Sequence, residues 1–262
     1  SLNSTYMSED CLYLNIYTPL TYEPQSLPVL LYIHGGDYLY GGTNDDQLKG
    51  CNLLNVTNDV LVVTIQYRLG IFGYLGSDDM RQLDPQKSTG NYGLLDQIQA
   101  LKWVKKNIGV FGGNSGKVTI FGESAGAGSV TNLLVATGAK HLYHKAIMQS
   151  GAFAEWTTKS LVNATAVYND VVKRSECGVN GKDAVSCLLK MEAKALVALS
   201  NEIMAYPDRW TVCRWAPTVD GIVIMDHPST IVLNNPELIN DVPIIYGNND
   251  EEGVSFLSAT TL

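Results

Sequence analysis

Long hydrophobic runs are absent from this sequence, and we therefore expect no transmembrane helix in it. No run of about eighteen or more uninterrupted apolar residues occurs, which is the length a transmembrane helix needs. The longest β-rich apolar runs, at 29–33 and 60–65, have the length of strands. An apolar leader is also missing, and Ser1 opens a polar segment, so we interpret this end as a mature or cut end. With 45% hydrophobic and 17% charged residues, the 262 residues are typical of one large globular domain.

Positive charge is scarce. The sequence has 18 Lys and Arg against 26 Asp and Glu, a formal net charge of −8. Binding to a nucleic-acid backbone needs a basic stripe, and the nearest cluster, Lys102, Lys105 and Lys106, has the spacing of a solvated helix face. We therefore expect no nucleic-acid partner.

The five cysteines, Cys11, Cys51, Cys177, Cys187 and Cys213, fit no zinc-binding spacing, and no metal site is predicted. Cys177 and Cys187 bracket a polar loop and could close a short disulfide. Three glycosylation sequons begin at Asn3, Asn55 and Asn163. Sequons and a disulfide together favour a secreted or secretory-lumen protein, in which the odd cysteine count leaves one thiol free or paired outside this chain.

Strand and helix patterns alternate along the chain. Apolar or β-branched runs predict strands at 11–17, 29–33, 60–66, 118–121, 145–149 and 243–246. Helical spacing predicts helices at 93–108, 124–136, 159–174 and 183–199, and residues 109–116 are interpreted as a tight loop. Alternation of this kind indicates an α/β fold with a mostly parallel sheet covered on both faces. No repeat or internal domain boundary is found in 1–262, and the helix-rich region of about 156–220 is expected to cap the sheet.

The strongest chemical signal is Gly-Glu-Ser-Ala-Gly at 122–126, where a predicted strand meets a predicted helix. This is the context of a nucleophile elbow, with Ser124 exposed on a turn so sharp that only glycine fits two residues before and after it. A helix N-terminus at Ser124 also favours developing negative charge. The alternative is a chance occurrence of a common pattern.

Two further features flank this serine in the order that ester chemistry needs. His34-Gly35-Gly36-Asp37 follows a strand, and its N–H groups, with that of Ala125, are suited to bind an oxyanion. Downstream, Asp250, Glu251 and Glu252 follow the last predicted strand, where the acid of a catalytic triad belongs. The alternatives are a structural glycine turn and a solvated acidic loop, and spacing alone does not choose among the three acids.

Together these and other pieces resemble the type-B carboxylesterase and cholinesterase-like family. The matching pieces, in family order, are Glu-Asp-Cys-Leu-Tyr-Leu-Asn at 9–15, His-Gly-Gly at 34–36, Tyr-Arg-Leu-Gly at 67–70, Gly-Asn-Tyr-Gly-Leu-Leu-Asp-Gln at 90–97, Phe-Gly-Glu-Ser-Ala-Gly at 121–126, Gln-Ser-Gly at 149–151 and the acidic piece at 247–253. The resemblance implies an α/β-hydrolase fold, incomplete at both chain ends.

The resemblance also assigns roles to residues. It implies that Glu252 is the triad acid and that Gly36, Asp37 and Ala125 donate to the oxyanion. Glu123 matches a carboxylate close to the triad. The resemblance further implies an acyl pocket at Thr211 and Cys213, roomier than in cholinesterases, a disulfide between Cys177 and Cys187, and a partner for Cys11 upstream of this chain.

Two positions depart from the family pattern. Asp37 stands where the third oxyanion glycine is expected, and a carboxylate there is unfavourable unless it points away. The family's catalytic histidine follows the acid by roughly a hundred residues, beyond Leu262. The four histidines present, His34, His141, His144 and His227, all precede the acid.

The sequence therefore predicts a serine hydrolase that cleaves small carboxylic esters by a Ser-Glu-His acyl-enzyme mechanism, with no metal or organic cofactor. The histidine would come from remaining segments of the same protein. The main alternative is a catalytically silent cholinesterase-like protein with an adhesive, storage or structural role. A lipase or peptidase on the same fold is a third interpretation.

Overall fold

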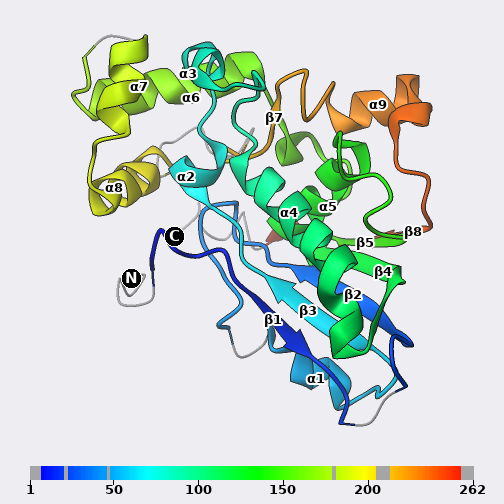
Figure 1. Ribbon diagram of the computed structural model, residues 1–262. Coiled ribbons are helices and arrows are strands. Elements are labelled where there is room, and N and C mark those ends of the chain that lie inside the picture. The colour runs from blue at the N-terminus through cyan, green and yellow to red at the C-terminus, as the bar shows by residue number, and fades with distance from the viewer. Residues whose placement is uncertain (1–6, 21–22, 46–47, 179–180, 205–212, 255–262) are drawn as a thin grey trace.

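The computed structural model describes residues 7–20, 23–45, 48–178, 181–204 and 213–254, and its centre is a twisted sheet (Figure 1). Six strands of the described chain lie in the order β1-β3-β2-β4-β5-β8. Only β1 runs antiparallel to its neighbour; the other pairs are parallel. Their bounds are β1 Leu14–Tyr17, β2 Leu27–Ile33, β3 Leu61–Ile65, β4 Gly113–Glu123, β5 Lys145–Gln149 and β8 Ile244–Gly247. The predicted α/β-hydrolase architecture with a mostly parallel sheet is confirmed.

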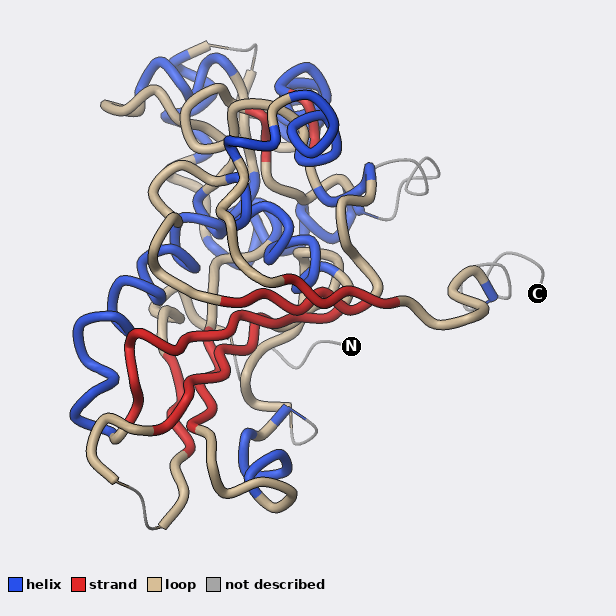
Figure 2. Tube along the Cα trace, turned by 90° about the vertical axis from the view of Figure 1, so that its right-hand side faces the viewer, coloured by secondary structure: helices blue, strands red, loops and turns tan. Residues whose placement is uncertain are grey.

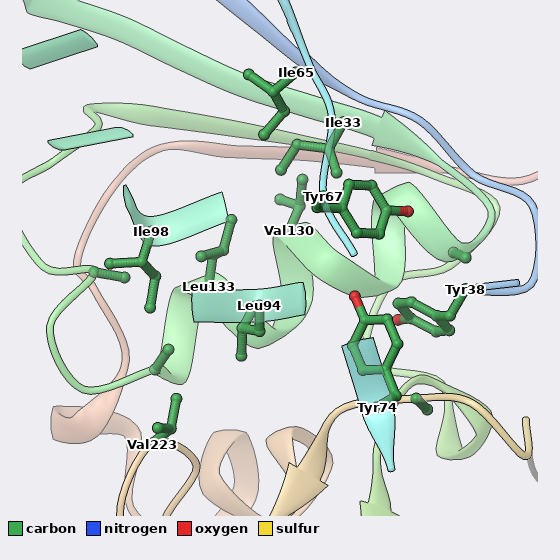
Figure 3. Packing of buried hydrophobic residues seen from close by; sticks show 14 of the residues in the cluster. Ile33, Tyr38, Ile65, Tyr67, Tyr74, Leu94, Ile98, Val130, Leu133 and Val223 are labelled. Carbon is green, nitrogen blue, oxygen red and sulfur yellow. The ribbon is translucent and has the colours of Figure 1, made fainter. Parts of the chain in front are cut away.

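Helices lie on both faces of the sheet (Figure 2). Along β2, buried and partly buried residues alternate, because one face meets the main core. On that face pack α4 (Tyr92–Asn107) and α5 (Ala125–Val135), whose Leu94, Ile98, Val130 and Leu133 lie opposite Ile33 and Ile65 (Figure 3). On the other face α1 (Gly50–Leu54) is close enough that a Cβ on Gly50 would lie 2.9 Å from Val62 Cβ. Every residue of β3 is buried, as a strand covered on both faces requires.

The remaining helices lie away from α1, around a small second sheet (Figure 1). That sheet pairs β6 (Lys159–Ser160) with β7 (Thr218–Val219). The helices are α2 Gly70–Tyr74, α3 Asp78–Leu83, α6 Leu161–Arg174, α7 Lys182–Leu188, α8 Ala193–Met204 and α9 Pro228–Asn234. Short 3-10 turns occupy Ile108–Phe111, Glu155–Thr157 and Pro236–Leu238.

Several predicted elements are wrong in extent; the strand predicted at 11–17, for example, is β1 over only Leu14–Tyr17. Residues 109–116 are not one loop: after a left-handed Gly112 (φ 89°), Gly113 pairs with Leu27 and begins β4. The helix predicted at 183–199 is two helices, because the chain turns at residues 189–192 so that α8 can pack against α6 and α2. The helix predicted from 159 begins at Leu161, after two residues of strand, and the Ser160 side chain caps it.

A buried carboxylate fastens the loop before α4 to the small sheet. Asp220 accepts hydrogen bonds on Oδ2 from Ser88 Oγ (2.7 Å) and Thr89 N (3.2 Å). Its Oδ1 accepts from the N–H groups of Ile222, Val223 and Ile224 at 3.0, 2.8 and 3.2 Å. Burial alone would raise the pKa of Asp220, but these hydrogen bonds outweigh it and lower the pKa below the usual 3.8.

We expect Asp220→Asn to lower the free energy of unfolding of the full-length protein by about 3 kcal/mol, since an amide cannot accept from five donors. A carboxylate with a depressed folded-state pKa contributes stability above its unfolded pKa, and this is lost as pH falls through the folded value. The variant should therefore lose less stability than wild type between about pH 5 and pH 2. Urea unfolding across pH measures both effects. The exposed Asp226→Asn is the control, since Asp226 Oδ1 accepts only its neighbour's N–H among the bonds found; an equal effect in both variants would contradict the anchoring role.

Candidate active site

Neighbouring strands bring the predicted site residues to one edge of the sheet. Glu123, Gln149 and Gly247 lie in one register row across β4, β5 and β8, and Ile33 of β2 pairs with Gly122. The chain leaves all four strands at this level. His34, Ser124, Ser150 and the acidic loop after Gly247 consequently start from the same edge, as ligand-binding residues do in open α/β sheets.

Ser124 occupies a strained turn between β4 and α5. Its backbone has φ 56° and ψ −122°, a conformation that L-residues adopt only where surrounding structure enforces it. Ser124 N–H donates to Gln149 O at 2.9 Å, and Ser124 O accepts from Gly128 N at 2.9 Å. The turn is therefore held from both sides, by β5 and by the first turn of a fully buried helix.

Two glycines make this turn possible. A Cβ on Gly126 would lie 2.1 Å from the carbonyl oxygen of Ile33, and one on Gly122 would lie 2.5 Å from the carbonyl carbon of Gly126. Both obstacles are backbone, so neither can move aside cheaply. The steric requirement behind the Gly-x-Ser-x-Gly pattern is thus present in this chain.

We expect Gly126→Ala to lower the free energy of unfolding by about 3 kcal/mol or more, because the added methyl group overlaps the end of β2. Gly109→Ala is the matched control: its Cβ would meet only the Gln25 side chain, at 3.4–3.6 Å. Urea unfolding of the two full-length variants should separate them. Equal stability would show that β2 and the turn are not in close contact.

The glycine-rich loop after β2 lies directly against the serine. A Cβ on Gly35 would be 3.2 Å from Ser124 Cβ. Gly36 and Asp37 have φ 102° and 53°, and Gly36 O accepts from Leu39 N (2.8 Å) and Tyr40 N (3.0 Å). Because C=O and N–H point in opposite directions in a trans peptide, these bonds turn the Asp37 N–H away from Leu39 and Tyr40. Ser124 O, bonded to Gly128, similarly directs the Ala125 N–H out of the start of α5.

The acidic loop presents one carboxylate that is bound to the neighbouring strand. Glu252 Oε1 accepts from Asn249 N (2.8 Å) and from Ser150 Oγ, which follows β5. The Ser150 bond, and then the Asn249 bond, lower the pKa of Glu252. Asp250 and Glu251 are exposed. Of the three candidate acids, Glu252 is the one that is hydrogen-bonded to Ser150, the residue that follows β5. Strand β5 lies next to β4, which ends directly before Ser124. Ser150 belongs to the Gln-Ser-Gly segment at 149–151, whose sequence did not predict this bond to the acid.

Glu123 lies between the loop and the acid. A Cβ on Gly35 would be 3.2 Å from Glu123 Oε2. Partial burial, followed by the nearby charges of Glu252 and Asp37, raises the pKa of Glu123. Glu123, Glu252 and Asp37 are thus close enough to act on one another, and the negative charge that they bring to this edge of the sheet favours neutral or cationic groups over anionic ones.

The histidines make their contacts elsewhere. His34 Nδ1 bonds Gly35 O (2.8 Å), and His144 Nδ1 accepts from Val118 N (3.2 Å), far along β4 from Ser124. His227 caps α9 and its ring bonds Ser229 and Glu155. In the part of the chain that the structure describes, no histidine ring is hydrogen-bonded to Ser124 or Glu252.

The other predicted residues divide into described and undescribed positions. Thr211 and Asn3 lie outside the described residues. Cys213 is half-buried, and burial, then Asp37, raises its pKa to about 12, so its thiol stays protonated. Cys177 and Cys187 are bonded to each other, whereas Cys11 and Cys51 are free. Asn55 and Asn163 are exposed.

Neither a metal-binding cluster nor a membrane-spanning helix is present among the described residues. Residues 7–20, 23–45, 48–178, 181–204 and 213–254 contain no cluster of three or more His, Cys, Asp or Glu side chains arranged to hold a metal ion. Among the same residues, none of the helices has the length and apolar character needed to cross a bilayer.

A mostly parallel sheet whose fourth strand turns sharply at Gly-x-Ser-x-Gly into a buried helix defines an α/β-hydrolase. The sequence profile of the carboxylesterase family matches residues 1–261. The chain belongs to the carboxylesterase family.

Relatives support this membership along the whole chain. Identity is 39% to the cocaine esterase of Oryctolagus cuniculus, over 94% of this chain and 43% of that protein. It is 40% to the acylcarnitine hydrolase of Mus musculus, over 97% of this chain and 42% of that protein. The crystal structure of a Geobacillus stearothermophilus carboxylesterase superposes with a TM-score of 0.84 at 34% identity, covering 99% of this chain and 51% of that one. The chain therefore spans about half or less of these relatives' lengths.

Proposed function

We propose that the protein containing this chain hydrolyses carboxylic esters by acyl transfer through Ser124. The observation that carries the proposal is the strained Ser124 turn lying against the Gly35–Gly36 loop, with Glu252 fixed at the same sheet edge. Relatives at about 40% identity that are named cocaine esterase and acylcarnitine hydrolase support an ester as the substrate.

The mechanism has two steps. Ser124 Oγ attacks the ester carbonyl while a histidine from outside this chain takes its proton, and Glu252 orients that histidine. The N–H groups of Gly36, Asp37 and Ala125 stabilise the tetrahedral oxyanion, and the histidine returns the proton to the leaving alcohol. Water activated by the same histidine then hydrolyses the acyl-enzyme. No step requires a metal or an organic cofactor.

The residues around Ser124 suggest features of the substrate, and the disulfide and sequons suggest the cellular compartment. Cys213 and Thr211 are proposed to line a roomy acyl pocket, and the carboxylates near Ser124 favour esters without a negative charge. Residues 1–262 are proposed to form part of one hydrolase domain, with about 156–220 as its cap. The Cys177–Cys187 disulfide, and sequons at Asn3, Asn55 and Asn163 proposed to carry glycans, support a secretory-pathway protein.

The test is hydrolysis of p-nitrophenyl acetate, butyrate and octanoate by the full-length protein. We expect kcat/KM above about 10⁴ M⁻¹s⁻¹ for the preferred ester, in the usual range for an enzyme on its own substrate class. A folded full-length protein with no turnover of any of the three esters would contradict the proposal.

The alternative, a silent adhesion or storage protein, draws support from Asp37, which brings a carboxylate to the proposed oxyanion loop. Asp37→Gly distinguishes the two. Under the silent alternative, the glycine variant gains turnover that the wild type lacks; under the proposed function, the wild type is already active.

A further inference from the structure

Two buried aromatic side chains that the proposed mechanism does not use meet at the start of the loop after β2. His34 begins this loop, and Tyr67 lies just beyond β3, whose Ile65 pairs with Ile33 (Figure 3). Both side chains belong to residues that are 2% exposed. Their rings stack with centroids 4.4 Å apart. A buried polar pair at the entrance of the oxyanion loop calls for an account of what its polar atoms hold.

Each of the two side chains holds one carbonyl oxygen of the loop. Tyr67 Oη donates to His34 O at 2.7 Å, and His34 Nδ1 bonds Gly35 O at 2.8 Å. Since Gly35 O can only accept, Nδ1 carries a proton. Burial lowers the pKa of His34 to about 4, so at neutral pH the ring is uncharged, with its proton on Nδ1. Burial also raises the pKa of Tyr67, which keeps its hydroxyl a donor.

These two bonds fix the direction of the next N–H groups. In a trans peptide the C=O and the following N–H point in opposite directions. The Tyr67 bond to His34 O therefore orients the Gly35 N–H, and the His34 bond to Gly35 O orients the Gly36 N–H. The loop needs such restraint, because Gly35 and Gly36 have no side chains to limit their backbone.

The surrounding packing leaves the His34 ring little room to turn. A Cβ on Gly41 (φ 103°) would lie 2.7 Å from His34 Nδ1, so the returning loop covers the ring edge. Tyr67 covers one face of the ring by stacking. Gln97 Nε2 donates to Ser129 Oγ (3.0 Å), which donates to Ala125 O (3.0 Å) and so restrains the start of α5.

We propose that Tyr67 and His34 are positioning residues that aim the Gly36 N–H group at the oxyanion formed on Ser124's substrate, with Tyr67 holding His34 in place and His34 holding the Gly35 carbonyl. The inference rests on the proposed ester hydrolysis and adds two residues to it. Neither side chain touches substrate; Tyr67 acts through the His34 backbone and ring, and His34 acts through the Gly35 carbonyl.

The test compares Tyr67→Phe with Tyr143→Phe in the full-length protein. Tyr143 is a matched control, since its buried hydroxyl donates to Leu133 O at 2.9 Å, away from the loop. Complete loss of one oxyanion donor costs about 10²–10³ in kcat, so we expect misalignment in Tyr67→Phe to lower kcat about tenfold with KM within about twofold. Affinity for a trifluoromethyl ketone, which forms a tetrahedral adduct with the serine, should fall by the same factor. Tyr143→Phe should change neither quantity.

A second pair of variants tests the same proposal in case Tyr67→Phe loses activity because it folds poorly. His34→Ala removes the donor to Gly35 O, whereas His34→Asn keeps an N–H at nearly the same place and should restore most of kcat. Hydrogen–deuterium exchange of peptides covering residues 33–40 should increase in Tyr67→Phe and His34→Ala, and stay at the wild-type level in Tyr143→Phe.

The outcomes separate this inference from the proposed function. Unchanged kcat in Tyr67→Phe, or equal kcat in His34→Ala and His34→Asn, overturns the positioning role. A wild-type protein that hydrolyses no ester overturns the proposed function instead; unchanged exchange at residues 33–40 in Tyr67→Phe then overturns the restraint on the loop as well.

Discussion

Ser124→Ala should lower kcat of the full-length protein by about 10⁶-fold on its preferred ester, the loss seen when a catalytic serine is removed from other serine hydrolases. The physical reason is that Ser124 has the only hydroxyl group among residues 122–126, which form the turn between β4 and α5. The proposed oxyanion donors remain in the variant, so a small residual rate above that in water is expected. Steady-state kinetics with a p-nitrophenyl ester measures the loss.

The serine variant needs a control for preparation and folding. Ser186→Ala, at an exposed position on α7, should keep the wild-type kcat. The thermal unfolding midpoints of wild type and both variants should agree within a few degrees. A Ser124→Ala protein that keeps more than about a hundredth of the wild-type kcat would require another nucleophile, since the expected loss is about 10⁶-fold.

Glu252→Gln should lower kcat by about 10⁴-fold. Glutamine keeps the size of the side chain and can still accept from Ser150 and Asn249, so the loop should hold its conformation. The variant loses the negative charge that, in the proposed mechanism, orients and stabilises a protonated histidine. KM should change little, because this role involves no contact between the acid and the substrate.

Glu251→Gln is the matched control, because Glu251 is the adjacent carboxylate and is exposed. It should retain the wild-type kcat within about twofold, as surface changes away from the chemistry usually do. The pair also decides between the acids that sequence spacing left open. A large loss in Glu251→Gln with full activity in Glu252→Gln would reverse the assignment.

Elements with strong local patterns could be predicted from the sequence, and those that depend on tertiary pairing could not. The β5 strand was predicted with its observed bounds, 145–149, and the apolar stripe of α4 predicted that helix to within a residue at each end. Residues 113–116 were predicted as loop because Gly, Asn and Ser have low strand propensity, yet they extend β4. Gly113 is in the strand because it pairs with Leu27, a partner that a local window does not contain.

The residues of the candidate site also divide into those that a local sequence pattern specifies and those that only tertiary pairing brings together. Ser124 and its glycines are specified by a contiguous pattern, because one sharp turn imposes all of it. Local spacing did not single out the acid, since Asp250, Glu251 and Glu252 have similar local surroundings, and only the family resemblance implied Glu252. Only the pairing of β8 with β5 brings Glu252 to Ser150. Tyr67 and His34 meet for a similar reason: β3 and β2 are neighbours in space although 33 residues separate the two side chains.

The most direct test of the central claim is covalent labelling of Ser124 in the folded, full-length protein. A fluorophosphonate probe reacts with a serine that is activated by its surroundings, and mass spectrometry locates the adduct. We predict one adduct on the peptide containing Ser124, abolished by Ser124→Ala and by heat denaturation before labelling. A folded wild-type protein that forms no Ser124-dependent adduct would contradict the assignment of Ser124 as a nucleophile.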